Sequence, residues 1–361
     1  MRPLNIAYYL GQYHPIEINN QAWGDGFTEW HNVARARPLY FGHKQPILPG
    51  KLGFYDLRLD TTIEEQIEYA CNNYIDGFCY WHYWFNGEIL LGEAFDRLLA
   101  LSNERVKLML GWANESWTGI WHGARDKVLI KQTYSKEELE QHCVLLASYF
   151  RNNNYLLHDG RPTLLIYKPR LIPDCRAYLE NLRSQIWKIN KQEVYIIGDW
   201  SPGFHQRINK PQDYGLDAVV VTPVGVLKEN NYLQYCYLVF DRFKKTIGIG
   251  PEIRNYDSIR KTRELANRMI DGIVHQSIVT GWDNTPRSGR RGLVLRHYNK
   301  RTFARDLRDV YEREMSNNTG LVFVKSFNEW AEGNVFEPKF RADWTESEVL
   351  ARVIRELYDK S

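Results

Sequence analysis

Cysteine is scarce in this sequence, and its few copies have no metal-binding spacing. The chain has five cysteines among 361 residues, an odd number, and no two of them stand in C-x-x-C spacing. The sequence therefore argues against both a disulfide framework and a zinc site. We expect all five to be buried free thiols: Cys71, Cys79, Cys143, Cys175 and Cys236.

Long hydrophobic runs are missing as well. No apolar stretch approaches the roughly 20 residues that a membrane-spanning helix needs, and the chain does not open like a secretory signal. We therefore expect no membrane span and a cytoplasmic protein. The net charge of +3 is too slight to indicate a nucleic-acid partner.

Two signatures of nucleotide-sugar chemistry are also absent. There is no Asp-x-Asp motif to hold a metal ion on a diphosphate. Gly248-x-Gly250 lacks the third glycine and the context of a phosphate-binding loop. Nothing in the sequence implies a metal site, and we expect no cofactor.

What the sequence does contain is a regular series of short apolar runs. Each is rich in β-branched or aromatic residues and nearly continuous, which indicates a strand covered on both faces. The chain is 43% apolar, and no composition shift or linker divides it. The predicted strands are 6–10, 77–84, 107–113, 163–168, 194–200, 218–223, 277–282 and 321–327.

Helical patterns lie between these strands. Three helices open on a Ser/Thr-x-x-Glu capping box, at Thr62, Ser135 and Thr345. Three more are expected over 174–189, 258–274 and 302–315. The alternation predicts an α/β fold, a single (β/α)8 TIM barrel spanning 1–361, with an open doubly wound sheet as the alternative. A long ordered loop, 11–60, is expected over the barrel mouth after the first strand.

Polar and aromatic side chains gather where the predicted strands end, which is where a barrel of this kind carries its active site. Carboxylates, amides, imidazoles and indoles suit a carbohydrate, because sugar rings stack on aromatic faces and their hydroxyls need dense donors and acceptors. The candidate substrate-binding residues are His14, His82, Trp84, Trp112, Asn114, Glu115, Tyr167, Trp282, Asp283 and Trp330.

Each of these residues also has a structural interpretation. With 12 tryptophans and 23 tyrosines, some of the aromatic residues serve packing alone. His14 and His82 fit equally well as hydrogen-bonded structural histidines. The Arg- and Lys-rich stretch from Arg287 to Arg308 is interpreted as a solvated loop and helix face, or alternatively as a contact for phosphate or an anionic sugar.

Glu329 and Glu332 are the candidate catalytic pair. They stand three residues apart in the turn that follows the last strand, and glycoside chemistry of the retaining type needs two carboxyl groups about 5 to 5.5 Å apart. Two acids this close repel one another, which raises one pKa as an acid catalyst requires. The alternatives are that one of them caps the turn or pairs with an arginine, or that Glu115 is the partner of Glu329.

The motifs resemble a known family over nearly the whole chain. They are similar to those of the WbsX-type proteins of bacterial polysaccharide biosynthesis, which resemble in turn glycoside hydrolase family 99, the retaining endo-acting α-mannosidases and α-mannanases. The segments that carry the resemblance are YYLGQYHPI, WGDGFTEWHNVARARPLYFGHKQPILPGKLGFYDLR, GFCYWHYWFNG, GWANESWT, GWDNTPR and SFNEWAEGNVFEP.

The resemblance implies a (β/α)8 barrel and roles for both glutamates. Glu329 would deprotonate the sugar's own 2-hydroxyl, which attacks the anomeric carbon to give a 1,2-anhydro intermediate. Glu332 would act as general acid and then as base. The hydrolases usually carry His where this chain has Ala331. The geometry around Glu332 and the preference for mannose therefore do not follow from the resemblance.

Three functions are consistent with the sequence. The first is retaining cleavage or transglycosylation of an α-linked glycan during surface or exopolysaccharide biosynthesis. The second is a glycosyltransferase that uses a nucleotide- or lipid-linked sugar donor. The third is a catalytically inactive glycan-binding barrel. The partner in every case is an oligosaccharide or polysaccharide.

Overall fold

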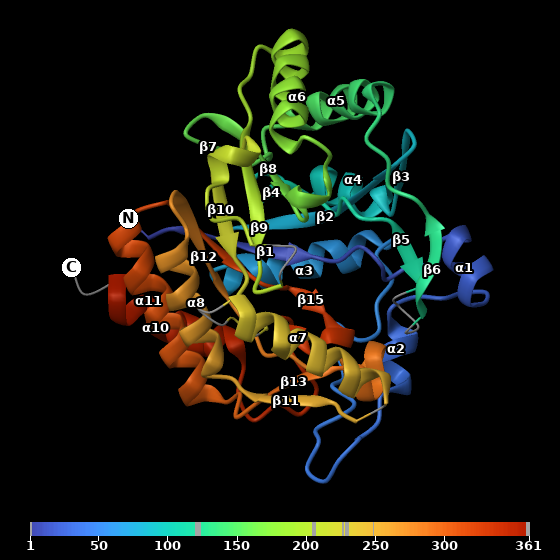
Figure 1. Cartoon of the computed structure of the whole chain (residues 1–361), viewed down its shortest axis with the longest axis vertical. Coiled ribbons are helices and arrows are strands. Elements are labelled where there is room, and N and C mark those ends of the chain that lie inside the picture. Colours follow the sequence, from blue (N-terminus) through green and yellow to red (C-terminus); the bar gives the residue numbers. More distant parts are fainter. Residues whose placement is uncertain are drawn as a thin grey trace.

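A closed barrel of parallel strands forms the centre of the protein (Figure 1). The computed structural model describes residues 2–119, 124–203, 207–225, 227, 231–247 and 249–358. The strands pair in chain order, and the last pairs with the first, with Leu4 opposite Leu321. The barrel strands are β1 (Leu4–Tyr9), β2 (Gly77–Phe85), β4 (Lys107–Trp112), β8 (Arg161–Ile166), β9 (Tyr195–Trp200), β10 (Ala218–Val221), β12 (Ile273–Ile278) and β14 (Leu321–Val324).

The predicted fold is confirmed, and barrel closure excludes the open sheet. The seventh strand was predicted wrongly, because it covers Ile273–Ile278 rather than 277–282. Its polar residues His275, Gln276 and Ser277 are fully buried, which hid the strand from a search for apolar runs. The two ring nitrogens of His275 lie 3.0 Å from the Tyr195 hydroxyl and 2.9 Å from that of Thr319.

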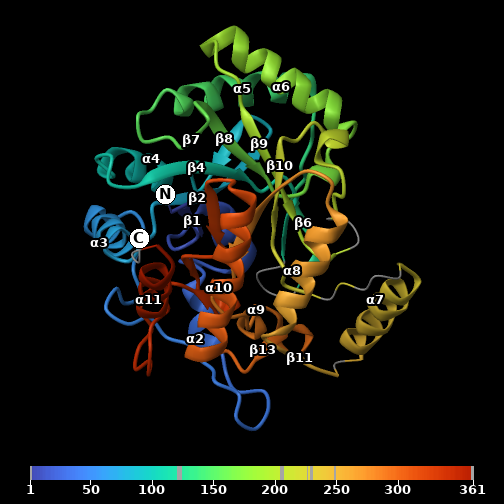
Figure 2. The same cartoon turned by 90° about the vertical axis from the view of Figure 1, so that its left-hand side faces the viewer.

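Helices cover the outside of the barrel (Figure 2). The predicted helix over 258–274 is too long, since α8 ends at Met269. No start signal announces α4, which follows Leu91 in the left-handed conformation with no side-chain cap. The covering helices are α3 (Asp60–Asn72), α4 (Gly92–Leu101), α5 (Lys136–Phe150), α6 (Cys175–Asn190), α8 (Ser258–Met269), α10 (Lys300–Asn317) and α11 (Glu346–Tyr358). Helix α7 (Asn231–Thr246) stands apart from the barrel (Figure 2).

Two of the three predicted capping boxes are present. At the start of α5 the Ser135 hydroxyl accepts the backbone N–H of Glu138 at 3.2 Å, and Thr345 and Glu348 bond reciprocally before α11. The prediction of a capping box at Thr62 was wrong, because α3 already begins at Asp60 and has no side-chain cap. A Ser/Thr-x-x-Glu pattern marks the start of a helix only when the residues before it are not already helical.

The long segment between β1 and α3 is ordered and covers the carboxyl ends of the strands, as predicted. It contains α1 (Glu17–Trp23) and α2 (Trp30–Arg35). The Tyr13 hydroxyl donates a hydrogen bond to the backbone oxygen of Asn328, beyond the last barrel strand. The first loop is therefore part of the same end of the barrel as the Glu329 turn.

Short elements extend the loops at this and the opposite end. They include two hairpins, β2–β3 and β5–β6, and a small parallel sheet of β11 and β13. Their bounds are β3 (Glu88–Leu90), β5 (Trp117–Gly119), β6 (Ala124–Ile130), β7 (Leu157–His158), β11 (Glu252–Asn255), β13 (Leu293–Arg296), β15 (Asn328–Glu329), β16 (Asn334–Val335), α9 (Thr285–Ser288) and the 3-10 turns Pro169–Leu171, Pro211–Tyr214, Gly289–Arg291 and Trp330–Glu332.

All five cysteines are free thiols, as expected, but they are not all buried. Cys71 and Cys236 are exposed, while Cys79, Cys143 and Cys175 are enclosed in the core. Among the helices that the structure describes, none is long and apolar enough to cross a bilayer.

Candidate active site

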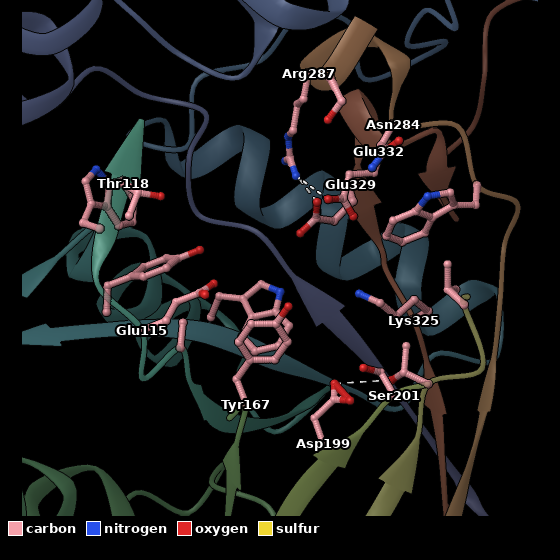
Figure 3. Close-up of a pocket in the computed structure, with 18 of the residues that line it drawn as sticks. Glu115, Thr118, Tyr167, Asp199, Ser201, Asn284, Arg287, Lys325, Glu329 and Glu332 are labelled. Atoms are coloured by element: carbon pink, nitrogen blue, oxygen red, sulfur yellow. Dashed lines mark hydrogen bonds and ion pairs between the residues drawn. The ribbon is translucent and has the colours of Figure 1, made fainter. Parts of the chain in front are cut away.

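A cavity of about 280 Å³ opens at the carboxyl ends of the barrel strands (Figure 3). Its walls mix charged and aromatic side chains that come from nearly every strand end. The main lining residues are Trp81, Tyr83, Glu115, Trp117, Thr118, Tyr167, Asp199, Ser201, Thr222, Trp282, Asn284, Arg287, Lys325, Glu329 and Glu332.

The turn after β14 delivers both glutamates of the predicted pair to this cavity. Glu329 ends β15, Glu332 ends the following 3-10 turn, and β16 pairs back onto β15. The Ser326 hydroxyl accepts the backbone N–H of Glu329 at 2.7 Å. Gly333 closes the turn with a φ of +56°, and an added Cβ there would lie 3.0 Å from the Asp283 side chain. Glycine is therefore required at this position.

Arg287 binds three carboxylates at once. Its guanidinium, carried by α9, donates to Glu329 at 3.0 Å and to Glu332 at 2.6 Å (Figure 3). It also donates to Glu29 at 2.7 Å. Burial alone would lower its pKa, but these three charges hold the pKa of Arg287 well above the usual value. The sequence left open that one glutamate of the pair binds an arginine, and in the structure both Glu329 and Glu332 do so.

Two of the three carboxyl groups titrate near neutrality. Burial, followed by the negative charge of Glu329, raises the pKa of Glu332 to about 7, although Arg287 acts against this shift. Burial likewise raises the pKa of Glu29 to about 7. Each therefore exchanges a proton in the pH range where a general acid is most effective.

The turn that carries Glu329 and Glu332 is fixed from behind by buried hydrogen bonds. The Trp330 indole N–H donates to Glu337 at 2.7 Å, and the Glu337 carboxyl also accepts from Tyr55 and Gln66. Asn328 bonds the backbone of Leu10 through both side-chain atoms, at 2.8 and 3.1 Å. Trp330 therefore lies behind the turn and not on the cavity wall.

Asp283 holds the segment that carries Arg287. Its carboxylate accepts from His43 at 2.7 Å, from Gln45 at 2.8 Å and from the Thr285 hydroxyl at 2.6 Å. Because Thr285 is the first residue of α9, these bonds fix the helix that presents Arg287. Asp283 does not line the cavity.

Three other predicted substrate contacts do line the cavity: Glu115, Tyr167 and Trp282. Glu115 is ion-paired with Lys168 and lies across the cavity from Glu329 and Glu332 (Figure 3). Asn114 supports this wall, since its side chain accepts the backbone N–H of Lys168 at 2.7 Å and donates to the Lys168 carbonyl at 2.9 Å.

Four predicted contacts are placed away from the cavity. His82, Trp84 and Trp112 pack around His142, with His82 Nε2 3.0 Å from His142 Nε2 and Trp84 stacked on the His142 ring. Burial lowers the pKa of His82 to about 3, so it is neutral. His14 is buried outside the cavity lining as well.

Four charged residues at the site were not among the predicted contacts: Glu29, Asp199, Arg287 and Lys325. The interpretation of Arg287 as part of a solvated face was wrong, because its guanidinium is buried against the glutamates, whereas Arg290 and Arg291 beside it are exposed. Glu29 could have been found within the WGDGFTEWHN segment, because it is the acidic residue that directly precedes α2.

Asp199 and Lys325 form the floor of the cavity (Figure 3). Burial raises the pKa of Asp199 to about 6, while Lys325 acts against the shift. One carboxylate oxygen of Asp199 accepts from the Thr222 hydroxyl at 3.3 Å, and the other has no hydrogen-bond partner among the described residues. The Lys325 ammonium lies 5.2 Å and 5.7 Å from the ring centres of Tyr8 and Trp282. This floor offers a donor and an acceptor side by side.

The site holds no obvious metal-binding group, since no cluster of His, Cys, Asp and Glu within the described ranges is arranged to ligate an ion. Residues 5–347 match the family described as "Glycosyltransferase WbsX". The chain belongs to the WbsX family. The family description names a glycosyltransferase, which is a class of carbohydrate-active enzyme.

Two curated proteins are similar to this WbsX chain over most of its length. The uncharacterized protein WxcX of two Xanthomonas campestris pv. campestris strains is 33% identical over 340 residues. The match covers 93% of this chain and 47% of WxcX, so the chain spans about half the length of these curated relatives.

Two solved structures share the fold of this WbsX protein. The GH99 endo-alpha-mannosidase from Bacteroides thetaiotaomicron superposes with a TM-score of 0.59 at 13% identity, over 97% of this chain and 95% of that chain. A glycoside hydrolase-like protein gives a TM-score of 0.57 at 15% identity, over 98% and 94%. Both are similar to the WbsX protein in the arrangement of their chains.

Proposed function

We propose that this WbsX protein is a retaining glycosidase or transglycosylase that acts on an α-linked glycan of a bacterial surface or exopolysaccharide. The observation that carries the proposal is the buried Glu329 and Glu332 pair on one guanidinium, with the pKa of Glu332 at about 7. We further propose that 1–361 acts as one catalytic domain.

The proposed chemistry gives each glutamate a separate proton. Glu329 takes the proton of the sugar's 2-hydroxyl, whose oxygen attacks the anomeric carbon while the bond to the leaving oxygen breaks. Glu332 donates its proton to that leaving oxygen. In the second step Glu332 deprotonates water or an acceptor hydroxyl, which opens the 1,2-anhydro ring as Glu329 returns its proton to the 2-oxygen.

This chemistry restricts the substrate. The 2-hydroxyl must be free and on the face opposite the leaving group, so an α-linked substrate must have the manno configuration at this carbon. Among the solved structures that share this fold is that of an endo-alpha-mannosidase, an enzyme named for α-linked mannose. Asp199 and Lys325 at the cavity floor suit the recognition of neighbouring sugar hydroxyls, one as acceptor and the other as donor.

A glycosyltransferase remains the second candidate, and the family description favours it. A nucleotide or lipid diphosphate would need cations in the cavity. The guanidinium of Arg287 is already bound to three carboxylates, which leaves Lys325 as the lining cation with no ion pair among the described residues. The third candidate, an inactive glycan-binding barrel, gives no reason for an acid that titrates near neutrality.

A thermal-shift screen separates these functions. Nucleotide sugars (UDP, GDP and TDP forms) are compared with α-linked manno-configured di- to tetrasaccharides, using the Glu332→Gln variant so that bound glycan is not consumed. A ligand at 100 times its Kd stabilises the fold by about 2.7 kcal/mol. We expect stabilisation by the glycans and their cleavage or transfer by the wild type. Stabilisation by one nucleotide alone would instead make the protein a transferase.

The pH profile of cleavage provides a second test. Because the general acid must carry its proton, kcat/KM is expected to fall tenfold per pH unit above the pKa of about 7 of Glu332. Because Glu332 interacts closely with the other charged groups around Arg287, the observed value belongs to the cluster. The measurement is kcat/KM between pH 5 and 9. A rate that stays level up to pH 9 would contradict the assignment of the acid.

A further inference from the structure

One helix of this protein presents an aromatic face to solvent. In α7 the side chains of Tyr235, Phe240 and Phe243 are 62%, 61% and 58% exposed, and Val239 and Ile247, the residue directly after the helix, are exposed with them. At 100° per residue these five side chains, here called the α7 stripe, fall on one side of the helix. Isolated exposed apolar residues are ordinary, but a contiguous stripe marks an interaction surface.

The opposite side of α7 is attached to the body of the protein. The Tyr237 hydroxyl contacts Glu252 and Arg254 of β11. Asp241, the one acidic residue in the sequence of α7, lies four residues further on and so on the same side as Tyr237. Figure 2 shows α7 standing apart from the barrel beyond β11. The stripe therefore faces away from the rest of the chain.

Basic side chains border the α7 stripe. At 100° per residue Arg242 and Lys244 fall on its two edges, and the Lys244 ammonium lies 5.8 Å from the centre of the Phe240 ring. The turn Gly289–Arg291 contacts α7 and adds the exposed Arg290 and Arg291. These four residues, here called the basic patch, include two arginines of the Arg-rich stretch that do not line the cavity.

We propose that the α7 stripe and the basic patch dock this protein on an anionic lipid surface. A helix that lies in a bilayer interface needs an apolar, aromatic face bordered by cations, whose stems reach along the apolar layer while their charges meet lipid phosphates. A second copy of the chain fits less well. A twofold contact would place the stripe and basic patch of one copy against the stripe and basic patch of the other. The described part of the stripe has no acidic residue that could pair with the cations of the basic patch.

The basic patch lies close to the rim of the cavity. Ser288 lines the cavity, and the turn that carries Arg290 and Arg291 begins at the next residue. Docking through α7 would therefore hold the cavity rim beside the lipid headgroups. This placement does not depend on the proposed function, because it concerns where the protein lies and not what it cleaves.

Vesicle co-sedimentation of the 361-residue chain tests the proposal. Vesicles of phosphatidylcholine alone are compared with vesicles containing about one quarter phosphatidylglycerol, at about 0.1 M salt, where charges act over about 10 Å. We expect binding to the anionic vesicles, with at least tenfold weaker partitioning of Phe240→Ser/Phe243→Ser. Arg290→Gln/Arg291→Gln should also weaken it severalfold and reduce its salt dependence. Trp187→Ser, an exposed aromatic on α6, is the matched control and should bind like the wild type.

Two results would overturn the proposal. The first is equal binding of the wild type to both vesicles, or none to either. The second is light scattering that shows a wild-type dimer and a monomeric Phe240→Ser/Phe243→Ser variant without vesicle binding, which would make the stripe an interface between copies. Thermal unfolding of each variant checks that the fold is intact, as expected for substitutions at exposed positions.

Discussion

Replacing Glu332 by glutamine is expected to lower kcat on an unactivated α-linked glycan by about 10³-fold while leaving the fold intact. Loss of a positioned general acid typically costs about 10² to 10⁴ in rate. Glutamine keeps the size of the side chain but cannot give a proton to the leaving oxygen. The variant is assayed beside the wild type on the same glycan and on a glycosyl fluoride, whose leaving group needs no proton.

The two glutamates should respond differently to the activated substrate. Glu332→Gln should recover much of its first-step rate on the fluoride, whereas Glu329→Gln should not, because the 2-hydroxyl still requires a base. Glu115→Gln is the control, since Glu115 also lines the cavity but is paired with Lys168 on the other wall. If Glu115→Gln abolished activity and Glu329→Gln left it unchanged, Glu115 and not Glu329 would belong to the catalytic pair.

Replacing Arg287 by methionine should cause the largest loss of stability of any single change at the site. The guanidinium is the shared partner of Glu29, Glu329 and Glu332, and removing one member of a buried ionic group costs about 3–5 kcal/mol. Methionine retains most of the side-chain volume, so the loss reflects charge and hydrogen bonding more than packing. The measurement is the free energy of unfolding by urea at pH 7.

The loss should depend on pH with a definite sign. Without the cation the pKa values of Glu29 and Glu332 in the folded protein rise further above the value of about 4.5 in the unfolded chain. The unfolded chain then loses these protons at a lower pH than the folded protein does, so the free energy of unfolding falls as the pH rises above about 4.5. The penalty should thus be small below pH 4.5 and largest above pH 7. Arg290→Met, at an exposed neighbouring arginine, should change stability by less than about 0.5 kcal/mol. A penalty for Arg287→Met that is equally small would show that the three carboxylates do not need this cation.

The barrel could be predicted from sequence because most of its strands are continuous apolar runs. The exceptions have physical causes. Strand β12 contains His275, Gln276 and Ser277, which are buried only because other strands and loops supply their hydrogen bonds. Helix α4 starts without a capping side chain, so the usual start signal is missing. Both features depend on tertiary contacts, which supply hydrogen bonds to the buried polar side chains and stabilise a helix that starts without a cap. A local sequence pattern does not contain these contacts.

The site was predictable where the chemistry lies within one short motif. Glu329 and Glu332 share a turn, and Glu115, Tyr167 and Trp282 follow directly on their strands or short loops. Arg287 stood in a stretch where solvated arginines are the rule, and its burial depends on Glu29, which lies 258 residues away in the chain. His82 and Trp112 also follow the strand-end rule, but their side chains point to the His142 layer outside the cavity.

Because the last barrel strand closes the barrel against the first, the site can form only late in the synthesis of the chain. Tyr13 and Glu29 complete the site from the start of the chain, whereas Asn328 and Glu329 leave the ribosome near its end, and the Tyr13–Asn328 bond spans 315 residues. At typical synthesis rates this interval is roughly 15 to 60 seconds. During that time the first loop lacks the contacts that the turn after β14 provides, and contacts of such high sequence separation form late and slowly. A nascent WbsX barrel thus remains without the cluster of carboxylates around Arg287 until its last strand is released, and a chain truncated before this strand should have no activity.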